Sequence, residues 1–283
     1  MKKLILCVSV CLAMAISLKP VLAGESNVPE SKSAAIENYI LNLYNQIDFG
    51  IGQCLSYDAF SKAYHGYLNL RNAGKLNIDK DILSICDFTL SSNQHRFWVI
   101  DLNKKKAIIN TYVAHGHGSG EEYANSFSNR ASSHQSSLGF YVTGDTYDGE
   151  HGTSLHLLGM DNDFNDAAFE RGIVVHGADY VSEKHIASNN CLGRSWGCPA
   201  VPAKLSASIV NTIKDGTCLF IYYPLQKYLQ ASYWLNKKID RLPEDNMNPK
   251  FQLMANNNIV KDTIIQYISK GNVDSVVTRK HSF

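Results

Sequence analysis

The sequence predicts a mainly β domain, built as a sandwich or barrel, with helical additions at both ends. From about residue 82 to 224, short segments rich in β-branched and aromatic residues follow one another, separated by Gly, Asn and Asp. No strand–helix alternation of the doubly wound kind runs through this region. Before and after it, apolar residues recur at helical spacing instead. A sandwich or barrel is the fold that closes such a series of short strands.

The amino-terminal flank predicts two helices. The first spans about 33–47, with its apolar positions at Ile36, Tyr39, Ile40, Leu43 and Ile47. The second is expected to begin after Ser56, whose hydroxyl suits an N-cap, and to end near Gly74. We expect these two helices to form a cap or docking element.

The expected strands cover residues 97–101, 106–114, 138–144, 153–158, 172–175 and 218–223. Further helices are expected over 202–214, 225–238 and 259–270.

The first residues predict export. Met1-Lys2-Lys3 precedes an apolar run from Leu4 to Leu18, and small residues before position 24 indicate a signal peptide cleaved after Ala23. An uncleaved anchor is the alternative, but the run is shorter than the roughly 20 residues that a spanning helix needs. We therefore expect a periplasmic or cell-envelope protein with no transmembrane segment in its mature chain. The expected divisions are the signal peptide 1–23, a linker 24–35, a helical segment 36–81, the β domain 82–224 and a helical extension 225–283.

Charge and cysteine content narrow the function. A net charge of +1 gives no reason to expect a nucleic-acid partner. Of the seven cysteines, five follow the signal peptide, at positions 54, 86, 191, 198 and 218. In an oxidising compartment we expect Cys198 to stay free and the other four to form two disulfides, for which three pairings are open.

One constellation of residues carries chemistry. Val174-Val175-His176-Gly177 ends an apolar strand, and Ser195-Trp196-Gly197-Cys198-Pro199-Ala200 follows after a loop. A thiol nucleophile with an imidazole base is the arrangement that acyl transfer needs. The sequence therefore assigns the nucleophile to Cys198 and the base to His176, with Ser195 orienting the imidazole or the leaving group. The amides of Trp196, Gly197 and Cys198 are the expected oxyanion hole.

These residues resemble those of the exported murein L,D-transpeptidases, whose catalytic domain is called YkuD-type. That family carries a His-Gly on a strand and then a Ser/Thr-His-Gly-Cys turn, in the order seen here. Ser137 to Val142 is similar to the family's strand entry, and the resemblance covers about half of the chain. The chain departs from the pattern at Trp196 and Ala200, and its His-to-Cys interval is longer than usual, which indicates a divergent branch.

The resemblance implies a YkuD-like β-sandwich or barrel that acts on peptidoglycan stem peptides. Cys198 would form a thioester with the third stem residue, usually a diamino acid, and release the terminal D-Ala. Transfer to an amine would give a 3-3 crosslink, and a lipoprotein lysine is another possible acceptor. Transfer to water would make the enzyme an L,D-carboxypeptidase. This chemistry needs no cofactor and no metal.

Several residues have open roles. Tyr141, His151, Gly177 and Arg194 are candidates for substrate binding, and Arg194 could also help the thiolate electrostatically. We expect the Trp196 indole to pack beneath the motif turn, with stacking on substrate as the alternative. The histidines at 115, 117, 151, 156 and 176 leave a zinc-dependent wall peptidase as a second hypothesis. A non-catalytic murein-binding module is the third.

Overall fold

A computed structural model describes residues 32–52, 54–150 and 152–243. The signal peptide, residues 24–31 of the predicted linker, His151 and the predicted helix over 259–270 lie outside the described residues, and residues 32–35 of that linker belong to the first helix. Among those described, no helix is both long and apolar enough to cross a membrane.

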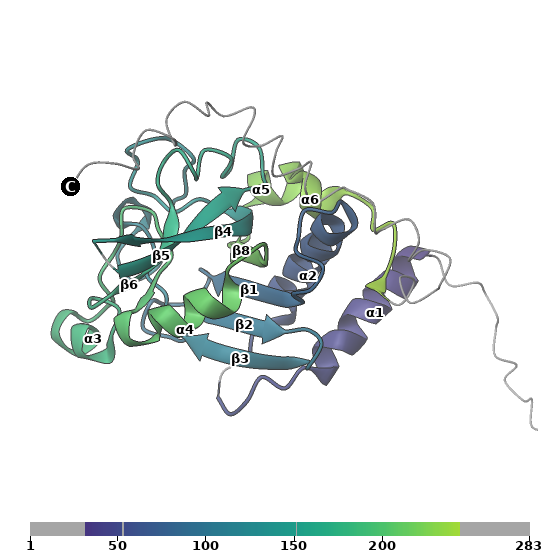
Figure 1. The fold of residues 1–283 in the computed structure, drawn as a ribbon, viewed down its shortest axis with the longest axis horizontal. Coiled ribbons are helices and arrows are strands. Elements are labelled where there is room, and N and C mark those ends of the chain that lie inside the picture. Colours follow the sequence, from purple (N-terminus) through teal and green to yellow (C-terminus); the bar gives the residue numbers. More distant parts are fainter. Residues whose placement is uncertain (1–31, 53, 151, 244–283) are drawn as a thin grey trace, which may run out of the picture.

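The fold is a nearly closed, barrel-like sheet of eight strands with helices around it (Figure 1). The strands are β1 Ile82–Asp87, β2 Phe97–Asp101, β3 Lys106–Thr111, β4 Gly139–Gly149, β5 Gly152–Gly159, β6 Val174–Ala178, β7 Ala200–Pro202 and β8 Cys218–Tyr222. Their order in the sheet is β3-β2-β1-β8-β4-β5-β6-β7. The β1–β8 and β6–β7 pairs are parallel, and the other pairs are antiparallel. The mainly β fold class predicted from the sequence is confirmed.

Six helices and a short 3-10 turn complete the described chain. They are α1 Lys32–Gln46, α2 Tyr57–Asn72, η1 His117–Ser119, α3 Glu183–Asn189, α4 Ala203–Ile213, α5 Gln226–Ala231 and α6 Tyr233–Asn236. The Ser56 N-cap of α2 is confirmed, since its side chain accepts a hydrogen bond from the Ala59 amide at 3.2 Å.

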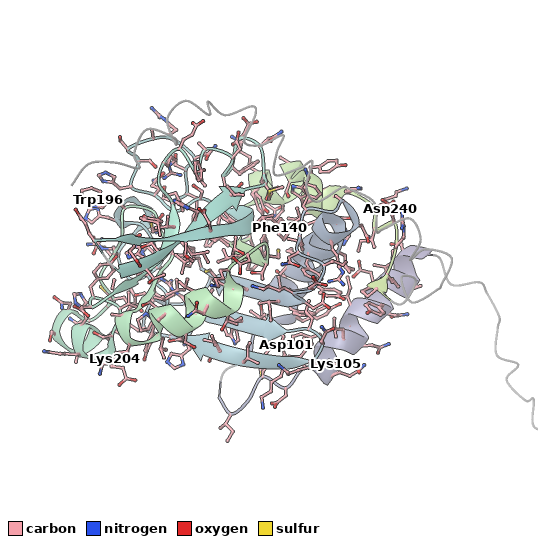
Figure 2. All side chains as sticks on the ribbon, in the orientation of Figure 1. Asp101, Lys105, Phe140, Trp196, Lys204 and Asp240 are labelled. Atoms are coloured by element: carbon pink, nitrogen blue, oxygen red, sulfur yellow. The ribbon has the colours of Figure 1, made fainter. Side chains whose placement is uncertain are left out.

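Helix α2 belongs to the same hydrophobic core as the sheet. It packs on β1 and β8, and its middle approaches β4 at Gly66. A Cβ at Gly66 would lie 2.0 Å from the ring of Phe140, so only glycine allows this approach. Phe140 in turn stacks on Phe220 of β8, with ring centroids 4.2 Å apart. Figure 2 shows Phe140 deep inside the molecule, between the sheet and the helices.

The predicted helix over 225–238 is two short helices in the structure. Ser232 separates them, and its hydroxyl both caps α6 at Leu235 and donates to Asp161 at 2.6 Å. Asp161 is buried and also accepts from the Phe140 amide and the Tyr228 hydroxyl. This carboxylate ties both C-terminal helices to β4, which explains the break.

The expectation of two disulfides is wrong. All five described cysteines are free. Cys218 pairs with Leu83 across the β1–β8 ladder, and Cys86 lies three residues further along β1. Side chains alternate between the two faces of a sheet, so the Cys86 and Cys218 sulfurs point to opposite faces. Both are buried among apolar residues and behave as core side chains.

Candidate active site

The Ser195–Cys198 turn is held by the segment that directly follows β3, residues 114–117. Ala114 forms a bridge with Ala200, and Gly116 forms one with Ser195. The Ser195 amide donates to the His115 carbonyl at 3.0 Å, and the Ser195 carbonyl accepts from the His117 amide at 2.7 Å. The turn that carries Cys198 is therefore fixed on both sides by backbone hydrogen bonds.

Two glycines make this turn possible. Gly197 has a φ of +124°, a conformation that residues with a side chain rarely adopt. A Cβ on Gly116 would lie 2.8 Å from the Gly197 Cα and 2.5 Å from the His134 carbonyl oxygen. Residues 116, 134 and 197 thus pack backbone against backbone directly beneath the motif.

The hydroxyl of Ser195 shapes the turn from inside. It donates to the Cys198 carbonyl at 2.6 Å and accepts from the Gly197 amide at 3.1 Å. Ser195 itself is buried. This geometry gives Ser195 a positioning role for the turn, whereas the sequence suggested that it orients the imidazole or the leaving group.

The Cys198 sulfur lies against the start of β6. It accepts a hydrogen bond from the Val174 amide at 3.4 Å and lies 3.7 Å from the Gly172 carbonyl oxygen, to which the thiol can donate. Burial raises the pKa of this thiol, while the Val174 amide and the Arg171 guanidinium act in the opposite direction. Because the net shift is upward, the resting group is the neutral thiol at neutral pH.

His176 lies on the same strand, two residues after Val174, and is buried. Its Nδ1 is 3.1 Å from the Gly177 carbonyl oxygen. A carbonyl can only accept, so Nδ1 is the donor of this contact, and in the neutral ring the lone pair is then on Nε2. The parallel β6–β7 register pairs His176 with Ala200, two residues after Cys198. The histidine and the cysteine therefore belong to neighbouring segments of one sheet edge.

Of the three amides expected to form the oxyanion hole, one already donates a hydrogen bond within the protein and two do not. The Gly197 amide is engaged by the Ser195 hydroxyl. No described residue accepts a hydrogen bond from the amides of Trp196 or Cys198. Those two N–H groups are the ones available to a ligand oxygen.

Arg171 is a residue that the sequence reasoning missed. Its guanidinium donates to the Ser128 and Gln135 carbonyls at 2.9 and 2.8 Å, and to the hydroxyls of Ser133 and Ser137. No described carboxylate forms an ion pair with it. A Cβ on Gly197 would lie 3.3 Å from its Nη2, so the positive charge borders the motif turn. The sequence signal that could have identified Arg171 is its position directly before Gly172-Ile173-Val174, which leads into the strand of His176.

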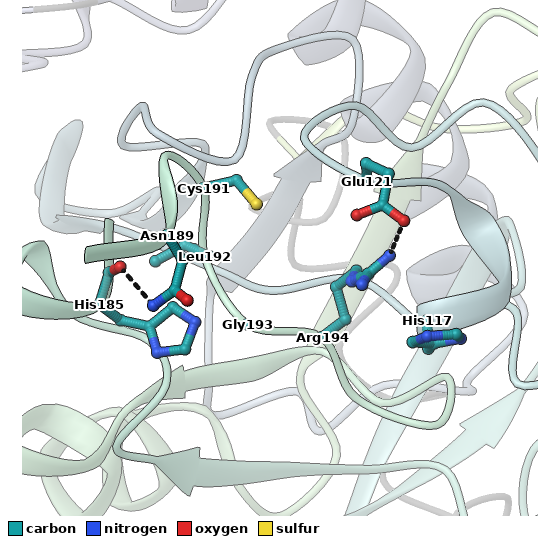
Figure 3. Close-up of a pocket in the computed structure, with 8 residues that line it drawn as sticks. All are labelled: His117, Glu121, His185, Asn189, Cys191, Leu192, Gly193 and Arg194. Carbon is teal, nitrogen blue, oxygen red and sulfur yellow. Dashed lines mark hydrogen bonds and ion pairs between the residues drawn. The ribbon is translucent and has the colours of Figure 1, made fainter. Parts of the chain in front are cut away.

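Arg194 was a candidate for electrostatic help to the Cys198 thiolate, but in the structure it is paired with Glu121. Its Nη1 lies 2.7 Å from the Glu121 carboxylate and donates to the Gly120 carbonyl at 3.1 Å. It lines a cavity of about 390 Å³ next to the motif, together with His117, Glu121, His185, Asn189, Cys191, Leu192 and Gly193 (Figure 3).

Of the other candidates for substrate binding, Tyr141 and Gly177 are buried, and His151 is not described by the structure. Tyr141 is fully buried in the core, where its hydroxyl donates to the Ser137 carbonyl, so it cannot line a cleft. Gly177 is buried too. It packs closely on α4, where a Cβ on it would lie 2.7 Å from the Ser206 hydroxyl. Its carbonyl, which orients His176, is its contribution to the site. His151 lies outside the described residues.

Trp196 does not pack beneath the turn. Its side chain is 76% exposed and stacks on His134, with ring centroids 5.1 Å apart and planes 11° from parallel. Figure 2 shows it at the edge of the molecule. Because the Ser195 side chain points inward from the turn, the Trp196 side chain points outward. The indole stacks on the His134 ring, and the backbone of His134 has a φ of +53°.

Three of the histidines proposed as zinc ligands, His115, His156 and His176, have protein partners. His115 Nδ1 lies 2.8 Å from a nitrogen of buried Arg96, and its Nε2 lies 3.2 Å from the Gly120 carbonyl. Burial and the adjacent Arg96 lower the pKa of His115 to about 3. Within the described part of the chain, no three His, Cys, Asp or Glu side chains converge as metal ligands.

Comparison with known proteins places this geometry in a family. Residues 52–222 match the family model of the L,D-transpeptidase catalytic domain. No curated protein matches. Similar solved structures include L,D-transpeptidases from Mycobacterium smegmatis (10% identity, TM-score 0.32), Mycobacterium tuberculosis (12%, 0.31) and Stackebrandtia nassauensis (12%, 0.31). The matches cover 50%, 50% and 66% of this chain and 59%, 58% and 90% of those chains. This chain therefore spans less than two thirds of the two mycobacterial proteins.

The family model covers more than half of the chain, including α2, both halves of the His–Cys motif and the sheet that carries them. The chain belongs to the L,D-transpeptidase catalytic domain family.

Proposed function

We propose that this protein is an exported cysteine acyltransferase that acts on peptidoglycan stem peptides and forms 3-3 crosslinks through a thioester at Cys198. One observation supports this most: the Cys198 sulfur lies on the Val174 amide, at the start of the strand that carries His176. The family match supports the class of reaction. Residues 1–23, acting as a signal peptide, would direct the enzyme to the periplasm or cell envelope and then be cleaved.

Acylation begins from the neutral thiol. Nε2 of His176 takes the proton as the sulfur attacks the carbonyl carbon of the third stem residue. The Gly177 carbonyl holds the imidazole in the required tautomer and stabilises the imidazolium that forms. The amide bond then breaks, the proton passes from His176 to the amine of D-Ala, and the thioester remains on Cys198.

Two features stabilise the charge that develops. The free amides of Trp196 and Cys198 donate to the oxyanion of the tetrahedral intermediate. The Arg171 guanidinium has no carboxylate partner, so its positive charge favours the thiolate as the proton leaves. Ser195 acts as a positioning residue that keeps the turn in this geometry.

The acceptor decides the product. An amine on a second stem, or a lipoprotein lysine, attacks the thioester carbonyl, gives its proton to His176 and releases the free thiol. Water in the same place gives an L,D-carboxypeptidase.

The purified enzyme and a disaccharide-tetrapeptide provide the test. Mass spectrometry should find free D-Ala with a crosslinked dimer for a transpeptidase, or with a tripeptide for a carboxypeptidase. Cys198→Ala should abolish both products, whereas Cys54→Ala, which replaces an exposed cysteine, should leave them unchanged. Chelators should have no effect. Turnover by Cys198→Ala, or turnover that depends on zinc, would disprove the proposal.

A further inference from the structure

We propose that an exposed cluster of three aromatic rings, Tyr147, His156 and Phe169, binds a sugar ring of the glycan chain to which the stem peptide is attached. We call this cluster the aromatic platform. The proposal deepens the proposed function and rests on it for the identity of the polymer. It assigns a binding role to residues that take no part in the acyl transfer itself.

The rings of the aromatic platform are held by contact with one another. Tyr147 of β4 stacks on His156 of β5, with ring centroids 4.7 Å apart and planes 20° from parallel. Phe169, in the segment before β6, lies 5.3 Å from the same histidine ring. The Tyr147 and Phe169 side chains nevertheless remain 42% and 49% exposed. The platform is therefore a preformed apolar surface that is open to solvent, which is a feature typical of binding sites.

Strand register places the aromatic platform on the same face of the sheet as His176. His156 is paired with Val174 in the antiparallel β5–β6 ladder, and residues paired in this way carry their side chains on one face. Side chains alternate along a strand, so Val174 and His176 also share a face. The Val174 amide donates to the Cys198 sulfur at 3.4 Å. A chain bound at Cys198 can therefore cross β6 and reach the platform on the next strand (Figure 1).

The spacing suits the sugar of the same stem. Ala200 is paired with His176 in the parallel β6–β7 ladder, and continuing this register places Cys198 beside Val174. Neighbouring strands lie about 4.8 Å apart, so two spacings separate β5 from the Cys198 segment by about 10 Å. An extended chain advances about 3.5 Å per residue, so the three stem residues from the sugar to the reacting carbonyl also span about 10 Å.

The edge of the aromatic platform is polar in the way that a sugar requires. Asp145 accepts from Nδ1 of His156 at 2.8 Å, and its side chain is 83% exposed. No described residue donates to its second oxygen. A sugar ring has an apolar face of C–H groups, which the negative face of an aromatic ring attracts, and a rim of hydroxyls that can donate to this carboxylate. An apolar protein surface would instead leave the carboxylate desolvated and without a partner, at a cost in free energy.

The first measurement compares kcat/KM for a disaccharide-tetrapeptide and for the free tetrapeptide. The wild-type enzyme should favour the disaccharide-tetrapeptide at least tenfold. Tyr147→Leu and Phe169→Leu, which keep an apolar side chain but remove the flat ring, should each reduce this preference several-fold and leave the value for the free tetrapeptide unchanged. Tyr147→Phe, which keeps the ring, should retain the preference. Tyr233→Leu, which removes an exposed tyrosine from α6, is the matched control and should behave as the wild type.

Unchanged turnover of the free tetrapeptide also serves as the folding control, because a misfolded variant would lose activity on both substrates. Equal wild-type turnover of the two substrates would overturn the proposal. A preference that neither leucine variant reduces would overturn it as well.

The second measurement does not depend on catalysis. Calorimetry of the full chain with a peptide-free tetrasaccharide of alternating N-acetylglucosamine and N-acetylmuramic acid should detect binding. Tyr147→Leu and Phe169→Leu should each weaken that binding about tenfold, whereas Tyr147→Phe and Tyr233→Leu should not. Absence of binding, or equal binding by both leucine variants, would overturn the proposal. Binding of the tetrasaccharide to the platform without turnover of either stem substrate would count against the proposed function alone.

Discussion

At the scale of single residues, the proposed chemistry depends on how the buried Cys198 thiol loses its proton. Burial raises the pKa of Cys198, and only the Val174 amide and Arg171 oppose that effect. We therefore expect iodoacetamide to alkylate Cys198 slowly at neutral pH and faster as the pH rises into the alkaline range, because only the thiolate reacts. Peptide mapping after timed quenching measures the rate at each pH. A rate that is already maximal at pH 6 would contradict a raised pKa.

Arg171 should be required for both the charge and the shape of the site. Arg171→Gln removes the positive charge beside the turn and the hydrogen bonds to residues 128–137. We expect kcat/KM to fall about tenfold or more, which corresponds to about 1.4 kcal/mol of transition-state stabilisation.

The pH profile separates the two roles of Arg171. In Arg171→Gln the alkylation profile of Cys198 should move to higher pH, whereas Arg171→Lys, which keeps the charge, should move it less. Arg130→Gln, on the exposed part of the same loop, is the control and should match the wild type. An unchanged profile in Arg171→Gln would show that the residue only supports the loop.

Trp196 shows that a residue's neighbours in sequence do not settle its environment. The sequence predicted a packed indole, but Ser195 takes the inward position of the turn and the indole lies on the surface over His134. An exposed ring beside the proposed nucleophile is available to stack on substrate. We expect Trp196→Ala to raise KM several-fold with little change in kcat, in steady-state assays with a disaccharide-tetrapeptide. Wild-type KM would show that the stack supports the loop instead.

At the scale of elements, the C-terminal helices are fastened by one buried carboxylate. Asp161 accepts from the Phe140 amide, the Tyr228 hydroxyl and the Ser232 hydroxyl, and so joins α5 and α6 to β4. Asp161→Ala leaves three buried donors without an acceptor. We expect it to lower the free energy of unfolding by about 3 kcal/mol in denaturant titrations. Glu170→Ala, which changes an exposed carboxylate, should have no comparable effect, and equal stability of the two variants would contradict the account.

The elements predicted from sequence were those with a strong local pattern. The bounds expected for β2 match the structure, and α1, α2 and α4 lie within one or two residues of their expected positions. Strand β1 was missed although it is apolar and almost wholly buried, and two other missed elements have little pattern of their own. Helix α3 has no buried residue, and β7 is a three-residue strand that exists only because it pairs with β6.

At the scale of the whole molecule, stability comes from the core and needs no covalent crosslinks. The buried cysteines at 86 and 218 belong to the apolar core, and all five described cysteines are free. We therefore expect excess dithiothreitol to shift the melting temperature by less than about 1 °C. A fall of several degrees would be the size that loss of a disulfide produces and would contradict this structure.

The candidate site was predictable where chemistry dictates residue type, and not where packing decides. A thiol and an imidazole in a glycine turn and at a strand end indicate acyl transfer wherever they occur, so Cys198 and His176 stood out in the sequence. The position of Arg171 against the turn depends on the loop 128–137, and the burial of Tyr141 depends on the closed sheet. Neither the position of Arg171 nor the burial of Tyr141 can be predicted from the local sequence pattern.

In the proposed mechanism, Cys198 forms the covalent intermediate. The most direct measurement is incubation of the purified protein with a carbapenem, followed by intact-mass and peptide-level mass spectrometry. We expect one covalent adduct per chain, mapped to the peptide that contains Cys198 and absent in Cys198→Ala. An adduct on Cys191 or Cys54 in its place, or no adduct while a tetrapeptide stem is still turned over, would contradict it.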